Sequence, residues 1–113
     1  MTAPEWFDIC SPDALQARTF YQEMFGWPVH VLDDNYTLIG TAEEPIGGIG
    51  QDGPDRPYTG IVVYFRVDDV DAALDRAQML GGGRRMEPMA IEGRGRIAVF
   101  TDPDGNPVGL VGP

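Results

Sequence analysis

The sequence predicts an α+β fold built from two successive βαβββ modules, and three observations lead to this prediction. Each half reads as a strand, an amphipathic helix and three short strands. The segment Glu44–Gly50, which ends the first half, parallels Asn106–Gly112 at the end of the second. Between them, Gln51–Tyr58 is rich in proline, glycine and aspartate, as linkers are. We therefore expect one domain over residues 1–113, with modules at about 1–50 and 59–113 and a linker at 51–58.

The first module begins with a strand over Trp6–Cys10, where side chains of two kinds alternate along the chain. Ser11 and Pro12 are expected to open a helix, with the serine hydroxyl as N-cap and proline at the first helical position. Apolar residues then recur at helical spacing until Gly26, which is placed to end the helix. Three short strands are predicted to follow, at Val29–Leu32, Tyr36–Ile39 and Pro45–Ile49.

The second module repeats this order. Thr59–Val67 is a strongly apolar strand, and Asp68 or Asp69 can cap the helix that follows. The buried stripe of this helix is predicted to consist of Val70, Ala73, Leu74, Ala77 and Leu80. The glycines at 81–83 stop the helix, and a turn at 102–105 separates the last two strands. These strands are predicted at Arg85–Ile91, Arg94–Phe100 and Pro107–Val111.

The composition limits the classes of function. With 113 residues, of which 42% are hydrophobic, the chain has enough apolar material for one core. A net charge of −10 disfavours nucleic acid and anionic membranes as partners. Neither a membrane-spanning stretch nor a signal peptide is recognisable, so a cytoplasmic location is expected. One cysteine, Cys10, and one histidine, His30, cannot build a Cys/His zinc site within one chain.

Strand alternation predicts which side chains face a ligand. A helix that follows a strand covers one face of the sheet, and in a strand successive side chains point to opposite faces. The first helix is therefore expected to cover Phe7 and Ile9, and the second to cover Ile61, Val63, Phe65 and Val67. The opposite, ligand-facing side then carries Trp6, Asp8 and Cys10 from the first module and Val62, Tyr64 and Arg66 from the second.

Asp8 and Arg66 have two interpretations. They could form a buried ion pair, because neither charge tolerates burial alone. If Asp8 lacks such a partner, its carboxyl group becomes a candidate general acid or base, and Tyr64 or Arg66 becomes a candidate for stabilising developing negative charge. Cys10 fits an inert buried thiol better than a nucleophile, because no histidine lies near it in the sequence.

Two segments, Phe20–Trp27 and Asp102–Asn106, resemble the vicinal oxygen chelate superfamily, which includes glyoxalase I, bleomycin-resistance proteins and extradiol dioxygenases. The resemblance covers essentially the whole chain. It implies eight strands that curl into a cup around one pocket, and it implies homodimers. Most members of this superfamily act through a metal ion.

In the metal-dependent members, the ligands lie on the first and last strand of each module. The matching positions here are Trp6, Val62, Gly109 and either Gly47 or Gly48. None of these side chains coordinates a divalent cation, and His30 alone cannot replace them. We therefore expect no metal and no other cofactor. The glycines could instead leave room for a larger flat ligand.

These considerations favour a metal-independent protein that binds a small organic molecule in an aromatic-lined cup and resembles the drug-sequestering bleomycin-resistance branch. The net acidity either only keeps the surface soluble or favours a cationic ligand, and the aromatic side chains favour a planar one. Trp27 and Phe100 are equally open to core packing. The aromatic candidates for the pocket are Trp6, Trp27, Tyr36, Tyr64 and Phe100.

Three other functions stay open. The chain could be a metal-free isomerase, lyase or cyclase that uses Asp8 as acid or base. It could be an assembly or regulatory module with a vestigial cup. It could also be a metal-dependent glyoxalase- or dioxygenase-like enzyme if the matched ligand positions are wrong.

Overall fold

The computed structural model describes residues 2–54, 59–91, 93 and 95–113. The chain forms two compact units. The first unit comprises Trp6–Ile61, and the second comprises Met1–Glu5 together with Val62–Pro113. The described residues contain two helices and eight strands in the order βαβββ, repeated twice, which confirms the predicted α+β class. Residues 55–58 of the predicted linker, and the predicted start of a strand at Arg94, lie outside the described residues.

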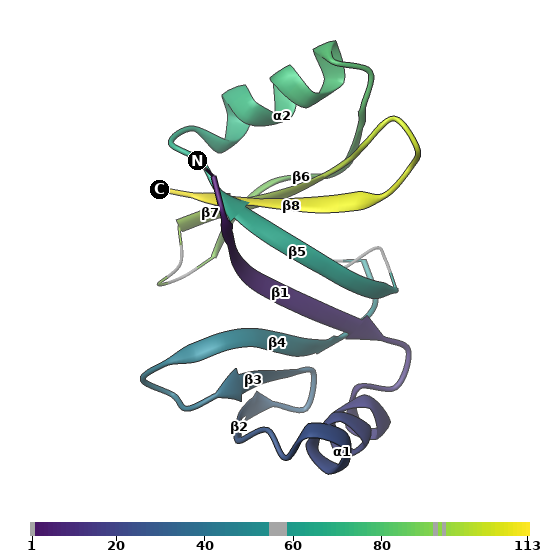
Figure 1. The fold of residues 1–113 in the computed structure, drawn as a ribbon, viewed down its shortest axis with the longest axis vertical. Helices are drawn as coiled ribbons and strands as arrows, with labels where there is room; N and C mark the ends of the chain where they lie inside the picture. Colours follow the sequence, from purple (N-terminus) through teal and green to yellow (C-terminus); the bar gives the residue numbers. More distant parts are fainter. Residues whose placement is uncertain (1, 55–58, 92, 94) are drawn as a thin grey trace. The chain divides into compact units, whose positions relative to one another are not determined.

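The first unit contains most of β1 (Pro4–Ser11), then α1 (Ala14–Phe25), β2 (Val29–Asp33), β3 (Tyr36–Gly40) and β4 (Pro45–Gln51). The strand order is β2-β3-β4-β1, and α1 lies beside these strands (Figure 1). Strands β2, β3 and β4 are antiparallel neighbours, whereas β1 and β4 are parallel. A parallel pair needs a long crossover connection, which here includes α1.

Helix α1 begins two residues later than expected. Its N-cap is Asp13, whose carboxylate accepts a hydrogen bond from the Gln16 backbone N–H at 3.0 Å. The Ser11 hydroxyl accepts from the Asp13 N–H instead, so the prediction of Ser11 as N-cap was wrong. A carboxylate at the N-cap satisfies a helix donor as well as a hydroxyl does. The predicted end at Gly26 is confirmed, because this glycine adopts the left-handed conformation with φ of 66°.

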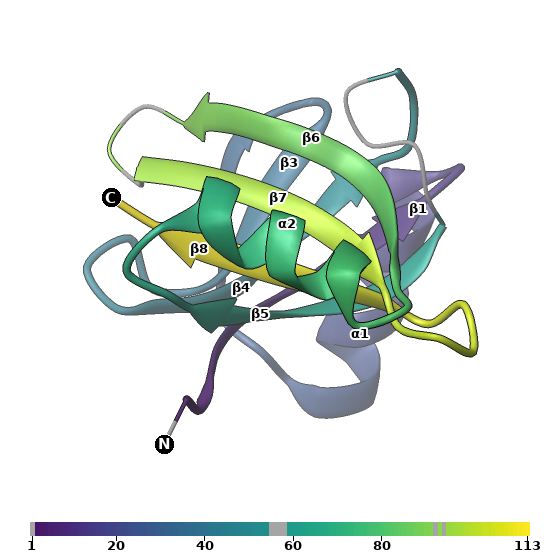
Figure 2. The same cartoon turned by 90° about the horizontal axis from the view of Figure 1, so that it is seen from above.

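The second unit contains most of β5 (Gly60–Arg66), then α2 (Val70–Met79), β6 (Gly83–Ile91), β7 (Gly95–Thr101) and β8 (Pro107–Gly112). The strand order is β5-β8-β7-β6, with β5 parallel to β8 and the other pairs antiparallel. Helix α2 crosses the face formed by β6, β7 and β8 (Figure 2). Asp69 caps α2 by accepting from the Ala72 N–H, as predicted for one of the two aspartates.

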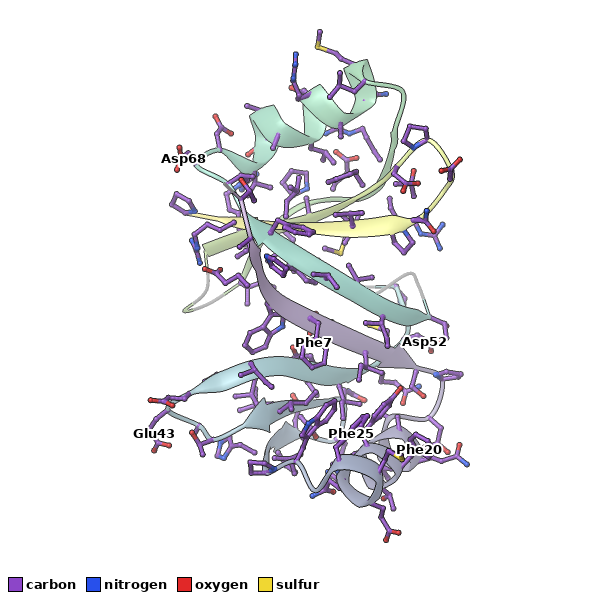
Figure 3. The ribbon with its side chains drawn as sticks, in the orientation of Figure 1. Phe7, Phe20, Phe25, Glu43, Asp52 and Asp68 are labelled. Atoms are coloured by element: carbon purple, nitrogen blue, oxygen red, sulfur yellow. The ribbon has the colours of Figure 1, made fainter. Side chains whose placement is uncertain are left out.

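Each unit has its own apolar core. In the first, a buried isoleucine cluster packs against side chains of α1, and Phe20 and Phe25 lie on that helix (Figure 3). In the second, α2 and the strands bury Val70, Leu74, Ala98 and Leu110. Two predicted helix-facing residues lie elsewhere: Ile61 and Leu80 are 56% and 65% exposed. Both stand at an end of their element, where the neighbouring element no longer covers them.

No helix in the described part of the chain is both long and apolar enough to cross a membrane.

Candidate functional site

A buried carboxylate with two hydrogen-bond donors lies in the first unit. Asp8, on β1, is only 6% exposed. Its Oδ1 atom accepts a hydrogen bond from the Trp6 indole Nε1–H at 2.9 Å and another from the Tyr36 hydroxyl at 2.6 Å. Trp6 and Tyr36 are themselves half-buried. We call these three residues the Asp8 cluster.

The strand register explains why these residues meet. Trp6 and Asp8 are two residues apart on β1, so their side chains share one face of the sheet. Gly48 of β4 lies directly opposite Asp8, and β3 brings Tyr36 in from the far side of β4. A Cβ atom at position 48 would overlap the Tyr36 hydroxyl and ring. Because Gly48 has no side chain, the Tyr36 hydroxyl can reach Asp8 across β4, the strand between them.

The second carboxylate oxygen of Asp8 is not completely buried. Both hydrogen bonds of this carboxylate end on Oδ1. Among the described residues, no buried side-chain oxygen or nitrogen lacks a hydrogen-bond partner. Since Oδ2 has none, it cannot be a fully buried atom. Within the described part of the first unit, no basic side chain pairs with Asp8.

The second unit also places a tyrosine over a glycine. Tyr64 of β5 lies opposite Gly109 of β8. A Cβ atom at position 109 would overlap the Tyr64 ring. Tyr64 and its neighbour on the same face, Val62, are 2% and 1% exposed. These residues are packed side chains in this structure, and neither presents a surface to solvent.

Arg66 and Asp8 each have other partners than the predicted ion pair. The Arg66 guanidinium binds the Glu5 carboxylate at 2.8 Å, and both side chains are substantially exposed. The hydrogen bond from Arg66 lowers the pKa of Glu5 below its ordinary value, against a smaller opposing effect of desolvation. Arg66 therefore pairs with Glu5 inside the second unit, and an ion pair between Arg66 and Asp8 stays a prediction. Arg66 belongs to an exposed ion pair of the second unit.

The other predicted site residues lie in three different settings. Cys10 is buried on β1, on the same face as Asp8. Gly47 faces the opposite side, where a Cβ atom would meet the Phe7 ring at 2.9 Å. Trp27 packs on that side too, with ring centroids 4.8 Å from Phe25 and 5.9 Å from Phe7. Phe100 packs against the α2 core of the second unit. Trp27 and Phe100 therefore pack against apolar side chains, which was the predicted alternative to a place in the pocket.

The sequence matches the family model described as "Glyoxalase/Bleomycin resistance protein/Dioxygenase superfamily" over residues 4–110. The chain belongs to this superfamily. Its structure is similar to that of an extradiol ring-cleaving dioxygenase from B. fuscum, with a TM-score of 0.63 and 24% identity over 97% of this chain and 33% of the other. It is similar as well to the hypothetical protein BH1468 from Bacillus halodurans, with a TM-score of 0.65 and 12% identity over 99% and 94%. At these identities the likeness concerns the fold.

Two curated relatives in this superfamily are more similar in sequence. The anthracycline biosynthesis protein DnrV of Streptomyces peucetius is 36% identical, over 91% of this chain and 44% of its own length. The putative glyoxylase CFP32 of Mycobacterium bovis is 33% identical, over 95% of this chain and 44% of its own length. The chain thus spans less than half the length of these relatives.

The superfamily's usual metal does not fit the residues present. Trp6, Gly48, Val62 and Gly109 supply no coordinating side chain at the matched positions. In the described ranges, no three His, Cys, Asp or Glu side chains gather closely enough to hold an ion. The tyrosine rings over Gly48 and Gly109 also fill the space that those glycines were expected to leave for a flat ligand. That expectation was wrong, because the chain's own side chains occupy the room.

Two features of the site were missed in the sequence. The Asp8–Tyr36 hydrogen bond depends on the register of three strands, and hydrophobic alternation does not specify register between distant segments. Glu5 as the partner of Arg66 was missed because 61 positions separate the two residues. A usable signal was present for the first feature: a glycine at a strand position where a larger residue is usual indicates close approach by another group.

Proposed function

We propose that this chain binds a small organic molecule without a metal, at the face of the first unit that carries Trp6, Asp8 and Tyr36. The observation that carries the proposal is the Asp8 carboxylate, which is 6% exposed, fixed through one oxygen and open through the other. A buried polar group held in one orientation beside aromatic side chains is a common element of small-molecule sites. Strongly buried carboxylates are otherwise rare unless they are paired.

The proposed ligand is planar and aromatic. Trp6 and Tyr36 flank the carboxylate and are half-buried, so part of each ring is available for contact. The relative DnrV is named as an anthracycline biosynthesis protein, and an anthracycline is a planar, fused-ring aromatic molecule. The proposal extends to sequestration of such a molecule by a homodimer.

Native mass spectrometry of the untagged protein tests the metal content, a co-purified ligand and the oligomeric state in one spectrum.

The two tryptophans provide a direct test of the binding face. The Trp6 indole N–H bonds Asp8, whereas Trp27 packs among Phe7, Tyr21 and Phe25 on the opposite face of the sheet. In ¹⁵N-labelled protein, an anthracycline aglycone is expected to shift the Trp6 indole resonance and leave that of Trp27 in place. Trp6→Phe and Trp27→Phe assign the two resonances.

Two outcomes contradict the proposal. An unchanged spectrum across a panel of planar aromatic probes would remove the evidence for a ligand at this face. A shift of the Trp27 resonance alone would place the binding surface elsewhere.

A second candidate function is metal-free proton transfer, as in an isomerisation. The observation that favours it is the 2.6 Å hydrogen bond between the Tyr36 hydroxyl and Asp8. In this scheme Asp8 takes a proton from one carbon of the substrate and returns it to another. Within the first unit, the Tyr36 hydroxyl and the Trp6 indole N–H are the polar groups beside Asp8. Asp8→Asn is then expected to abolish turnover of an identified substrate while binding persists. Equal turnover by this variant would exclude the scheme.

A further inference from the structure

We infer that the Asp8 cluster selects a ligand that carries an N–H or O–H donor, with a protonated amine preferred, and that Gly48 and Tyr36 are positioning residues for this selection. The inference rests on the proposed function, because it names the class of ligand that the same face accepts. Three observations support it: the direction of the hydrogen bonds, the charge around them, and the space that Gly48 leaves for the Tyr36 ring.

In the Asp8 cluster, the side-chain donors of Trp6 and Tyr36 are both directed at Asp8. An indole has one N–H and no acceptor, and the N–H of Trp6 is donated to Asp8 Oδ1. A tyrosine hydroxyl has one proton, and that of Tyr36 is donated to the same atom. An ionised carboxylate only accepts. The group that this cluster offers to a ligand is therefore an acceptor, Asp8 Oδ2, and an anionic ligand would meet negative charge there.

The charge around the cluster favours a cation over a neutral donor. The net charge of the chain is −10, and within the described part of the first unit no basic side chain pairs with Asp8. Because Asp8 is 6% exposed, its charge is screened less than that of a surface carboxylate. Hydrogen bonds between ionised partners are also shorter and stronger than those between neutral ones. A protonated amine gains both contributions, whereas an amide or a hydroxyl gains the hydrogen bond alone.

Gly48 fixes the direction of the open oxygen. With Trp6 and Tyr36 both bonded to Oδ1, the carboxylate cannot rotate without breaking two hydrogen bonds. The Tyr36 contact exists only because position 48 has no Cβ atom. A side chain at this position displaces the Tyr36 ring and frees the carboxylate to rotate. Gly48 thus acts on the ligand through Tyr36 and Asp8, without contacting it.

The test compares two probes that differ in one charge. The probes are an anthracycline with a free amino sugar and the same molecule with that amine acetylated, titrated by calorimetry and followed on the Trp6 indole resonance. The free amine is expected to bind on the order of tenfold more tightly, the ratio that a charge-assisted hydrogen bond provides over a neutral one. In Asp8→Asn the preference is expected to disappear while the acetylated probe binds as before.

Tyr36 and Gly48 are tested as a pair by a double-mutant cycle. Gly48→Ala is expected to reduce the preference for the free amine. In a Tyr36→Ala background, Gly48→Ala should change nothing further, because no ring remains to be displaced. A general packing role for Gly48 would instead lower the affinity for both probes equally in both backgrounds.

The outcomes separate this inference from the proposed function. Equal affinity for the two probes, with a shifted Trp6 resonance, overturns the inference and leaves the binding face intact. A preference for the amine that survives Asp8→Asn also overturns it, because general surface acidity then explains the preference. Binding of neither probe overturns both. Should Asp8→Asn fail to fold, Tyr36→Phe, which keeps the ring and removes the hydroxyl, is expected to reduce the preference and tests the same contact.

Discussion

Each of the two units places a tyrosine over a glycine at a corresponding position, but the two tyrosines differ in origin and exposure. In the second unit, Tyr64 stands on the first strand and covers Gly109 opposite it. In the first unit, the corresponding position of the first strand carries Asp8, and the ring over Gly48 comes from Tyr36 two strands away. The duplicated framework thus fills the space over a glycine twice, in the second unit with the buried Tyr64 ring and in the first with the Tyr36 ring, whose hydroxyl donates to Asp8.

This difference shows that the backbone repeat does not by itself determine a site. Both glycines are among the predicted metal-ligand positions, and both are covered by a ring. Tyr64 is 2% exposed, whereas Tyr36 is half-buried. The partial exposure of Tyr36 beside Asp8 is what makes the first unit the candidate for ligand binding.

The largest expected effect concerns the two glycines. In Gly109→Ala the new methyl group meets the buried Tyr64 ring, which has little room to move, and we expect a loss of about 3 kcal/mol of unfolding free energy. In Gly48→Ala the half-buried Tyr36 ring can move outward, so we expect a loss of about 1 kcal/mol, mainly the hydrogen bond to Asp8. Urea denaturation measures both.

Gly53→Ala is the matched control for these two substitutions. No atom lies within 4 Å of a Cβ atom built at this glycine. Its unfolding free energy is expected within about 0.5 kcal/mol of the wild type. If Gly48→Ala were as destabilising as Gly109→Ala, the contrast between a movable and a fixed ring would be incorrect.

A smaller effect is expected at Asp8. Asp8→Ala leaves the Trp6 N–H and the Tyr36 hydroxyl without their acceptor, at a cost of about 2 kcal/mol in unfolding free energy. Asp8→Asn keeps a carbonyl oxygen that can accept one or both bonds, so its cost should be clearly lower. Thermal unfolding at constant pH compares the two variants. Equal stability of the alanine variant and the wild type would mean that both donors are satisfied by water and that the cluster is not held together.

The smallest effect belongs to the exposed ion pairs of the second unit. The Arg84 guanidinium bonds Glu87 and Asp75, each at 2.8 Å, and its hydrogen bond to Glu87 lowers the pKa of that carboxyl group below the ordinary 4.5. A lowered folded-state pKa gives stability that is present above pH 4.5 and is lost as the pH falls through the folded-state value. Arg84→Gln should therefore flatten the decline of stability in acid.

The acid experiment has a control in the first unit. Arg18 pairs with no acidic side chain among the described residues, so Arg18→Gln should leave the acid profile unchanged. Direct titration of the Glu87 side chain by NMR reports its pKa in the wild type. A normal value there would show that the ion pair does not persist in solution.

Much of the fold could be predicted from local patterns. Helical spacing and the glycine after Phe25 located α1 and its end, and the caps and glycines around α2 did the same there. Alternation placed Trp6, Asp8 and Cys10 on one face of β1, because that face follows from period two alone. Such features depend on residues a few positions apart, so the sequence of one segment is sufficient to predict them.

The contacts between segments could not be predicted in the same way. Alternation suggests that Asp8 and Arg66 could meet, but it says nothing of Glu5 or Tyr36, which compete for these groups. Ser11 was also a suitable N-cap. In the structure, however, the Asp13 carboxylate accepts from the Gln16 N–H, and the Asp13 carbonyl accepts from the Ala17 N–H. In each case several partners were chemically suitable, and the backbone geometry selected one.

The contact between Tyr36 and Gly48 also constrains how this protein could change during evolution. A metal-ligating side chain at position 48 cannot be accommodated while the tyrosine is present, and loss of the tyrosine alone removes a partner of Asp8. The two positions are therefore epistatic: either single substitution is unfavourable, and only the double substitution reopens the space. Such a pair would make the loss of a larger side chain at position 48 difficult to reverse in single steps.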